Sequence, residues 1–296
     1  MSQPPSLPLI DLQDIVGQEH VKRALEVAAA GGHPVLLSGP PGAGKTMLAR
    51  ALAGILPPAD DDATPAPFCA PHATTTLRRL LGTPEQVGGA LVQARGGVLF
   101  LDDLPSFGPK LHALAAALDG ALPGEPVGLG CLLVAAQQPC PCGWYGEAER
   151  VCTCTPALVA RYRRRVPHAL LRHLAIHVIV PHLRVEQLTS GRLGEPSAAV
   201  RTRVLAARAR QAARSTNGAG PTLNADLGPA AIRAHCLLDG AAQSLIQAAV
   251  RQLSLSAQAY HQVLRLARTI ADLAGAERIG AAHLAEAVQY RRREEA

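Results

Sequence analysis

Residues 39–46 read Gly39-Pro40-Pro41-Gly42-Ala43-Gly44-Lys45-Thr46, the complete phosphate-loop pattern G-x-x-x-x-G-K-[ST]. The glycines let successive backbone N–H groups turn inward around phosphate oxygens, Lys45 can reach the β- and γ-phosphates, and the Thr46 hydroxyl can bind Mg²⁺. An apolar strand is predicted at 34–38 and a helix at 47–56, and a helix N-terminus after such a loop attracts anions. The stretch predicts a nucleoside triphosphate site made of residues 39–46 and Met47.

Apolar runs alternate with helical patterns on both sides of this loop. Continuous apolar runs of this kind are typical of a parallel sheet that is covered on both faces. We therefore predict an α/β fold, a P-loop parallel sheet sandwiched by helices, followed by a small all-helical lid domain from residue 229 onward. The other predicted strands are 97–103, 131–136 and 176–180, and the other helices of the sheet domain are 18–30 and 110–122.

The length of 296 residues suits one large or two medium domains. The Pro- and Ser-rich residues 1–10 predict a disordered lead-in. We assign 11–190 to the nucleotide-binding domain, including a cysteine loop at 139–155, and 191–296 to a connecting helix and the lid. The break between them is expected within 185–220.

The overall composition limits the classes of function. A net charge of +6 permits binding to a polyanion such as DNA without proving it. No apolar run is long enough to span a membrane, and the first residues lack a signal-peptide pattern, so a cytoplasmic protein without a membrane partner is expected. In a reducing compartment the seven cysteines should be reduced or metal-bound rather than paired in disulfides.

The predicted strand at 97–103 ends in Asp102 and Asp103, at about the interval from the phosphate loop that a Walker B strand needs. In that interpretation Asp102 orients the Mg²⁺ shell together with Thr46, and Asp103 polarises the attacking water. The alternative is a strand that simply ends in a polar turn.

Two close cysteine pairs, Cys140-x-Cys142 and Cys152-x-Cys154, are separated by nine residues. Paired cysteines in a reducing compartment are the usual ligands of a tetrahedral structural Zn²⁺ site. The alternative is four reduced thiols in a loop. Buried apolar positions are expected for the three remaining cysteines, which are Cys69, Cys131 and Cys236.

Arginines follow the cysteine loop and recur near residue 200. The first group either forms a solvated face or contacts a DNA backbone or a neighbouring subunit, and it comprises Arg161, Arg163, Arg164 and Arg165. The second group is predicted to form the solvent-facing surface of a helix, and it comprises Arg201, Arg203, Arg208, Arg210 and Arg214.

Several of these segments together resemble the bacterial Mg-chelatase-related AAA+ proteins of the ComM/YifB type. They are Val16-Gly17-Gln18, residues 39–46, 97–107, 139–146, 255–273 and 282–291. The resemblance implies an ATP- and Mg²⁺-dependent module that assembles into a homo-oligomeric ring, a hexamer, around DNA and is linked to branch migration. It places Val16, Gly17 and Gln18 near the adenine and gives Lys45, Asp103 and Gln138 catalytic positions.

The chain departs from the family pattern at four catalytic positions. Asp103 stands where the family has Glu, and a carboxylate retracted by about 1.5 Å can cost about 10²-fold in rate. Gln138 replaces the sensor Asn, His173 occupies the position of an arginine clamp on the γ-phosphate, and Gln258 replaces the lid arginine. The family's N-terminal domain, which resembles a Lon-protease-like fold, is not expected here, because Met1 lies about ten residues before the AAA+ region.

Two interpretations of the function remain open. The chain is either a DNA-linked AAA+ ATPase with impaired hydrolysis, or a degenerate adaptor or regulatory subunit that binds nucleotide to set assembly with a partner. In the first case Asp103, Gln138 and nearby arginines retain some of the catalytic roles. The magnesium-insertion role of distant chelatase relatives is a third, less favoured function. The sequence also leaves open whether the chain is a stand-alone paralogue or a fragment.

Overall fold

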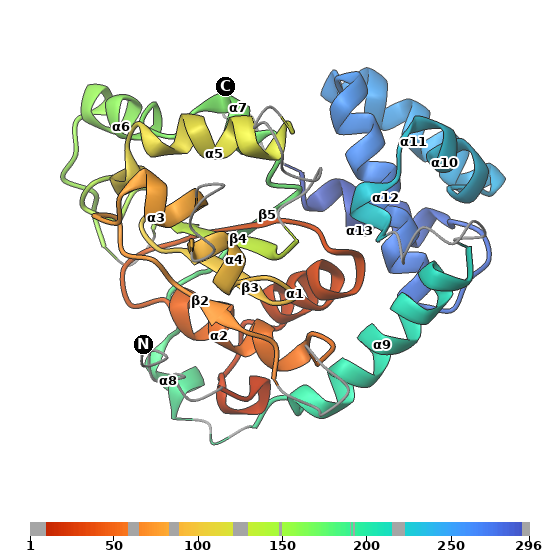
Figure 1. Ribbon diagram of the computed structural model, residues 1–296, viewed down its shortest axis with the longest axis horizontal. Helices are drawn as coiled ribbons and strands as arrows, with labels where there is room; N and C mark the ends of the chain where they lie inside the picture. The colour runs from red at the N-terminus through yellow and green to blue at the C-terminus, as the bar shows by residue number, and fades with distance from the viewer. Residues whose placement is uncertain are drawn as a thin grey trace.

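The protein is built on a five-stranded parallel sheet in the order β2-β3-β4-β1-β5 (Figure 1). The computed structural model describes residues 10–58, 65–82, 89–120, 130–147, 150–189, 191, 193–214 and 223–291. Neighbouring strands are all parallel, so helices must carry the chain back between them. The strands are β1 (Val35–Ser38), β2 (Phe68–Cys69), β3 (Val98–Leu101), β4 (Leu132–Gln137) and β5 (Ile176–Ile179).

The inner strands β1, β3 and β4 bury alternate side chains in two different cores, whereas the edge strand β5 buries Ile176 and Val178 in the first core only. Val35 and Leu37 of β1 belong to one core and Leu36 to the other, because successive side chains of a strand point to opposite faces. Helices cover both faces, which confirms the predicted α/β class. The first face is covered by α1 (Glu19–Gly31), α2 (Lys45–Ile55) and α9 (Ser197–Arg214). The second is covered by α3 (Leu77–Leu81), α4 (Ala90–Gln93), α5 (Lys110–Leu118) and α7 (His168–Leu171).

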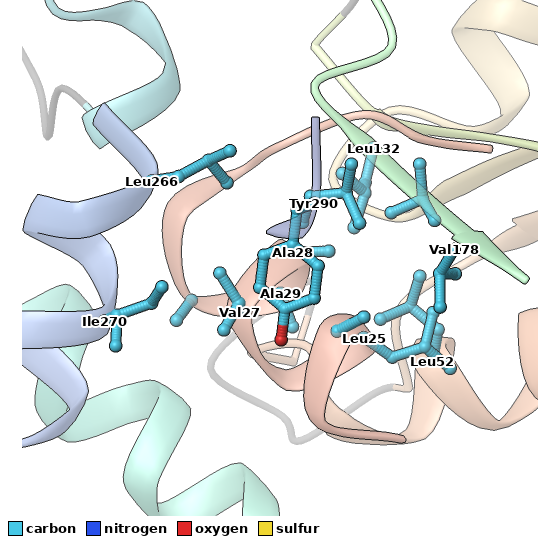
Figure 2. Close-up of a cluster of buried hydrophobic side chains, with 14 of the residues drawn as sticks. Leu25, Val27, Ala28, Ala29, Leu52, Leu132, Val178, Leu266, Ile270 and Tyr290 are labelled. Carbon is cyan, nitrogen blue, oxygen red and sulfur yellow. The ribbon is translucent and has the colours of Figure 1, made fainter. Parts of the chain in front are cut away.

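Helix α1 is buried on two sides, against the sheet and against the C-terminal helices. Figure 2 shows Leu25 of α1 near Val178 of β5, while Leu266 and Ile270 of α12 approach α1 from the opposite direction. Seven alanine, leucine and valine side chains of α1 are fully inaccessible, a run too continuous for an ordinary amphipathic surface helix. Side chains of α1, of the sheet and of α12 therefore belong to one continuous hydrophobic core.

The C-terminal region is helical, as the sequence predicts. It contains α10 (Pro229–His235), α11 (Gly240–Leu253), α12 (Ala257–Leu273) and α13 (Ala281–Gln289) and lies at one end of the sheet (blue in Figure 1). The backbone N–H of His177 in β5 donates to the carbonyl of Tyr290 just after α13, at 2.8 Å. Two further short helices, α6 (Pro156–Arg163) and α8 (Val185–Leu188), lie before α9 in the sequence.

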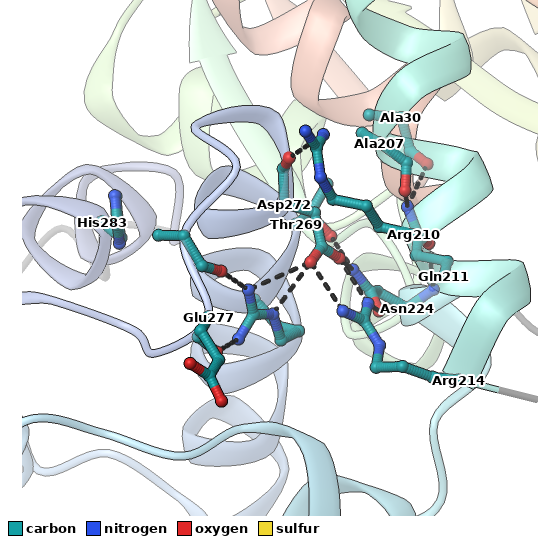
Figure 3. Close-up of polar contacts among 12 residues, drawn as sticks. Ala30, Ala207, Arg210, Gln211, Arg214, Asn224, Thr269, Asp272, Glu277 and His283 are labelled. Atoms are coloured by element: carbon teal, nitrogen blue, oxygen red, sulfur yellow. Dashed lines mark hydrogen bonds and ion pairs between the residues drawn. The ribbon is translucent and has the colours of Figure 1, made fainter.

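A buried polar cluster joins α9, α12 and the start of the lid (Figure 3). The carboxylate of Asp272 accepts hydrogen bonds from Arg214, Arg268 and Asn224, and both Asp272 and Arg268 are about fully buried. The Nε2 atom of His33, at the corner between α1 and β1, lies 2.8 Å from the Thr269 hydroxyl. Buried charges persist only where they are paired and hydrogen-bonded. The cluster therefore fixes the orientation of α12 on the sheet domain.

The prediction that the arginines of α9 form a helix surface was only partly correct: Arg210 is exposed, but other members of the row contact neighbouring helices. Arg201 donates to the carbonyl of Gly54 and Arg208 to that of Ala29, while Arg203 pairs with Glu26 at 2.5 Å. The carbonyls at and near helix C-termini have no partner inside their own helix, so guanidinium groups satisfy them well. The charged row therefore fastens α9 to α1 and α2.

Other predictions differ in their boundaries or lie outside the described residues. Helix α5 ends at Leu118, earlier than residue 122, with Asp119 as its C-cap. The lead-in at 1–9, part of the loop at 57–67 and the shortened segment at 122–131 fall wholly or mainly outside the described ranges. Within the described part of the chain, every helix is too short or too polar to cross a membrane.

Candidate nucleotide-binding site

The phosphate loop connects the end of β1 to the first turn of α2. Gly44 has φ +90°, in the left-handed region that side chains disfavour, and an added Cβ at Gly39 would lie 2.1 Å from the carbonyl oxygen of Val180. Glycine is thus required at one position for its backbone angle and at the other for a close approach. The loop is held against the residue that follows β5, with its concave side at the N-terminus of α2.

Lys45 lies across this loop. Its Nζ donates to the carbonyls of Gly39 at 2.8 Å and Pro40 at 2.7 Å. Burial lowers the pKa of Lys45 from its ordinary value, and the Asp102 and Asp103 carboxylates oppose that shift. A half-buried ammonium next to anion-binding N–H groups is the arrangement that suits a β/γ-phosphate group.

Thr46 and Asp102 meet although 56 positions separate them in the sequence. The Thr46 hydroxyl donates to Oδ2 of Asp102 at 3.0 Å. Oxygens around an octahedral Mg²⁺, each about 2.1 Å from the ion, lie about 3.0 Å apart, so this pair fits a magnesium shell. Both residues lie in a pocket of about 370 Å³ lined by Pro41–Met47, Asp102, Asp103, Gln137 and Gln138.

Asp103 adopts a left-handed backbone conformation directly after β3, with φ 52°. Its carboxylate accepts a hydrogen bond from the Ser106 hydroxyl. It also faces the Tyr162 hydroxyl: burial, followed by the Asp103 charge, raises the pKa of Tyr162 to about 12. The Ser106 hydroxyl therefore orients the carboxylate that the sequence predicts as the general base.

Gln138 lies in the same pocket, one residue after β4, as expected for a sensor residue. The neighbouring Gln137 also lines the pocket and donates to the Ser38 hydroxyl at 3.3 Å. Sequence reasoning missed Gln137 and Tyr162. A polar residue at the end of a parallel strand beside the phosphate loop was an available signal for Gln137, since ligands bind at the carboxyl ends of such strands.

Val16, Gly17 and Gln18 do not line this pocket, but Gln18 lies close to the start of the loop. Its Nε2 donates to the carbonyl of Pro181 at 2.7 Å, one residue beyond the Val180 that abuts Gly39. The Oε1 atom of Gln18 is buried and has no hydrogen-bond partner among the described residues. A buried acceptor without a donor is costly and suggests a ligand donor.

The two remaining drifted positions lie away from the pocket lining. Nε2 of His173 is 2.9 Å from an Asp119 carboxylate oxygen, so this imidazole is engaged within its own chain. Gln258 is exposed in the first turn of α12. One turn later, Gln262 donates to the backbone carbonyl of Arg172 at 2.6 Å, which brings the lid helix against the segment that carries His173.

The four predicted zinc ligands come together. The Sγ atoms of Cys140, Cys142, Cys152 and Cys154 all lie within 4.8 Å of one another. Three of the separations are 3.3, 3.5 and 3.7 Å. Thiolates bound to Zn²⁺ at about 2.3 Å in a tetrahedron lie about 3.8 Å apart, so the cluster fits this ion. The backbone N–H of Trp144, with that of Thr153, lowers the pKa of the Cys142 thiol to about 5, whereas burial and the neighbouring sulfur atoms raise the pKa values of Cys152 and Cys154.

The other cysteines and the first arginine group have mixed outcomes. Cys236 is buried as predicted, whereas Cys69 and Cys131 are only half-buried at the edge of the second core. The arginines after the cysteine loop have exposed side chains, and the Arg163 guanidinium lies 4.8 Å from the Tyr145 ring centre. This exposure is compatible with both interpretations of that group.

Comparison with known proteins agrees with this geometry. The family model described as magnesium chelatase, subunit ChlI, matches residues 11–65, 59–119 and 128–188, and its C-terminal companion matches 194–291. Among curated proteins, Competence protein ComM of Haemophilus influenzae is 37% identical over 318 residues, which cover 95% of this chain and 60% of ComM. YifB of Salmonella typhimurium and YifB of Escherichia coli are each 35% identical, with the same coverage. The chain thus spans 60% of the length of these relatives. It belongs to the magnesium chelatase subunit ChlI family, in the group of AAA+ proteins that includes ComM and YifB.

Proposed function

We propose that the chain binds ATP together with Mg²⁺ in the pocket of the phosphate loop. The observation that carries the proposal is the meeting of Lys45, Thr46 and Asp102 beside the N-terminus of α2. Lys45 and the loop N–H groups would hold the β- and γ-phosphates, and Thr46 with Asp102 would hold the metal. The buried Oε1 of Gln18 is a suitable acceptor for the exocyclic amino group of adenine.

Hydrolysis by this site is expected to be slow. The bound metal would neutralise charge on the phosphates, while Asp103, oriented by Ser106, would accept a proton from the attacking water and Gln138 would position it. Asp103 is one methylene shorter than the glutamate that the family pattern has there. His173 contacts Asp119 of its own chain and cannot supply the planar, permanently charged clamp of an arginine.

By analogy with its relatives, the module would assemble into a ring, a hexamer, and act on DNA. The exposed arginines at 161–165 support this proposal, because they offer a surface for phosphate groups or a neighbouring subunit. The second candidate function is a nucleotide-dependent adaptor without motor activity. The drift at Asp103, Gln138, His173 and Gln258 favours it.

The cysteine cluster is proposed to hold a structural Zn²⁺. Four sulfur ligands leave no open coordination position, so the ion would stabilise a loop rather than take part in a reaction.

Nucleotide binding is tested first, with a fluorescent ATP analogue titrated in the presence of Mg²⁺. Lys45→Ala should abolish or strongly weaken binding, whereas Lys110→Ala is the matched control, because Lys110 donates to the carbonyls of Ala73 and Thr75 outside the pocket. A wild-type chain without affinity for the analogue would refute the proposal.

Turnover then separates the two candidate functions. Phosphate release that increases with branched or single-stranded DNA and disappears in Lys45→Ala supports the motor. Binding without turnover, with assembly that depends on another protein, supports the adaptor. Steady turnover of about several per second, typical of competent ATPases, would contradict the impaired-hydrolysis interpretation.

A further inference from the structure

The cysteine loop is packed directly against the nucleotide pocket. An added Cβ at Gly143, between Cys142 and Trp144, would lie 2.4 Å from Cδ of Pro41 in the phosphate loop and 2.9 Å from Oε1 of Gln138. Gly143 has φ +84°, and its N–H donates to the carbonyl of Cys140 at 3.0 Å. The tight turn that carries two of the four cysteines therefore supports two parts of the pocket wall.

The same loop also contacts the segment after β5, through the Trp144 ring. The Trp144 ring lies 6.1 Å from that of His182, which follows the Pro181 carbonyl that holds Gln18. The Arg150 guanidinium lies over the Trp144 ring, 4.5 Å from the ring centre. Residues of the loop thus contact both the phosphate loop and the segment beside the proposed adenine acceptor.

The second cysteine pair leads into α6, which faces Asp103. Thr155, directly after Cys154, caps this helix, and Arg163 at its end donates to the carbonyl of Pro139 at 3.4 Å, next to Cys140. Tyr162 of the same helix faces the Asp103 carboxylate and the backbone of Gln138. A link between the two cysteine pairs would therefore hold the turn at Gly143 and helix α6 together, and both of these lie against residues of the pocket.

In its described part, the stretch between the two cysteine pairs is held by such side-chain and turn contacts rather than by a helix or a strand. The described residues 143–147 and 150–151 contain no helix or strand, and Val151 is 86% exposed. Ordering such backbone costs free energy for each residue, and a cross-link offsets that cost by restricting the loop.

We propose that a thiolate-bound Zn²⁺ at Cys140, Cys142, Cys152 and Cys154 holds the loop at 139–155 against Pro41 and Gln138, so that the metal controls the order of the phosphate loop and its affinity for MgATP. This inference rests on the proposed nucleotide function, but its structural part does not. Gly143 and Tyr162 are positioning residues in this scheme. Zinc removal releases the turn from Pro41 and α6 from Asp103.

The experiment compares zinc-loaded and chelator-treated full-length chain. Metal analysis should give one zinc per chain before treatment. After removal, amide hydrogen exchange should rise at 39–46 and 156–163, the affinity for a fluorescent ATP analogue with Mg²⁺ should fall about tenfold, and added Zn²⁺ should restore both. Cys152→Ser should behave like the chelated chain, and Cys69→Ser, a cysteine outside the cluster, should behave like the wild type.

Gly143→Ala distinguishes the effect of the metal from the effect of the contact with Pro41. Its Cβ collides with Pro41, while all four cysteines remain. It should keep one zinc and still show faster exchange at 39–46 and weaker nucleotide binding. This variant and the chelated wild type decide the question even if Cys152→Ser fails to fold. A chain that takes up no zinc, or one whose exchange and affinity are unchanged by zinc removal, would overturn the inference. If no variant or metal state binds nucleotide while exchange at 39–46 still follows zinc, the proposed function fails and the structural coupling stands.

Discussion

The stability of the protein should fall between pH 8 and pH 5 because of His33. This side chain is buried between α1 and α12, with its Nε2 2.8 Å from the Thr269 hydroxyl. Burial, assisted by the charge of Arg265, lowers its pKa from 6.5 to about 3. The contact is tight, because even a Cβ at Gly31 would lie 2.3 Å from the same nitrogen.

The sign and size of the effect follow from proton binding. Below pH 6.5 the unfolded chain gains a proton on His33, whereas the folded chain gains it only near pH 3. The free energy of unfolding is therefore highest above pH 6.5 and decreases as the pH falls toward 3. The gap between 6.5 and pH 5, at about 1.36 kcal/mol per pH unit, gives a loss of about 2 kcal/mol.

Urea unfolding at pH 8, 6.5 and 5 measures this loss. Burial also lowers the pKa of His283, so the comparison uses the difference between wild type and His33→Gln, which removes this one titrating group. The variant should be less stable at pH 8 but should lose about 2 kcal/mol less than the wild type on going to pH 5. His72→Gln is the matched control because His72 is exposed. Equal pH-dependent losses in wild type and His33→Gln would refute the reasoning.

Three further substitutions test the lid junction, the proposed general base and the start of α6, and a fourth, Thr202→Ala, is their control. Asp272→Ala should lower the free energy of unfolding by about 3–5 kcal/mol, because it leaves the buried guanidinium of Arg268 without its carboxylate; a loss below about 1 kcal/mol in urea titrations would be inconsistent with this. Asp103→Glu should raise ATP turnover by up to about 10²-fold in a phosphate-release assay, and no gain would show that the shorter carboxylate does not limit hydrolysis. Thr155→Ala should cost about 1 kcal/mol by thermal unfolding, because the Thr155 hydroxyl caps α6. Thr202→Ala, on the exposed side of α9, should change stability by less than about 0.5 kcal/mol.

Local sequence patterns were sufficient for most of the sheet domain. The glycine spacing at 39–46 predicted the phosphate loop, and the apolar runs at 97–103 and 131–136 predicted two buried strands, because a strand buried on both faces must be apolar throughout. The strand predicted at 176–180 is present as β5, but only one of its faces is buried. The same patterns predicted the four-cysteine cluster, since short spacing within each pair restricts where the sulfur atoms can lie. Boundaries were less accurate, as at the end of α5.

The sequence by itself determined the fold class, the phosphate loop and the four cysteines proposed as zinc ligands, because each depends on residues close together in the chain. Only the tertiary structure decided which distant groups meet. It placed Thr46 beside Asp102, Tyr162 beside Asp103 and Gly143 against Pro41. It also showed that arginines of α9, which we expected on a solvent-facing helix surface, contact helix-end carbonyls and a buried carboxylate. Such contacts are set by strand order and helix packing, and one-dimensional periodicity carries no information about them.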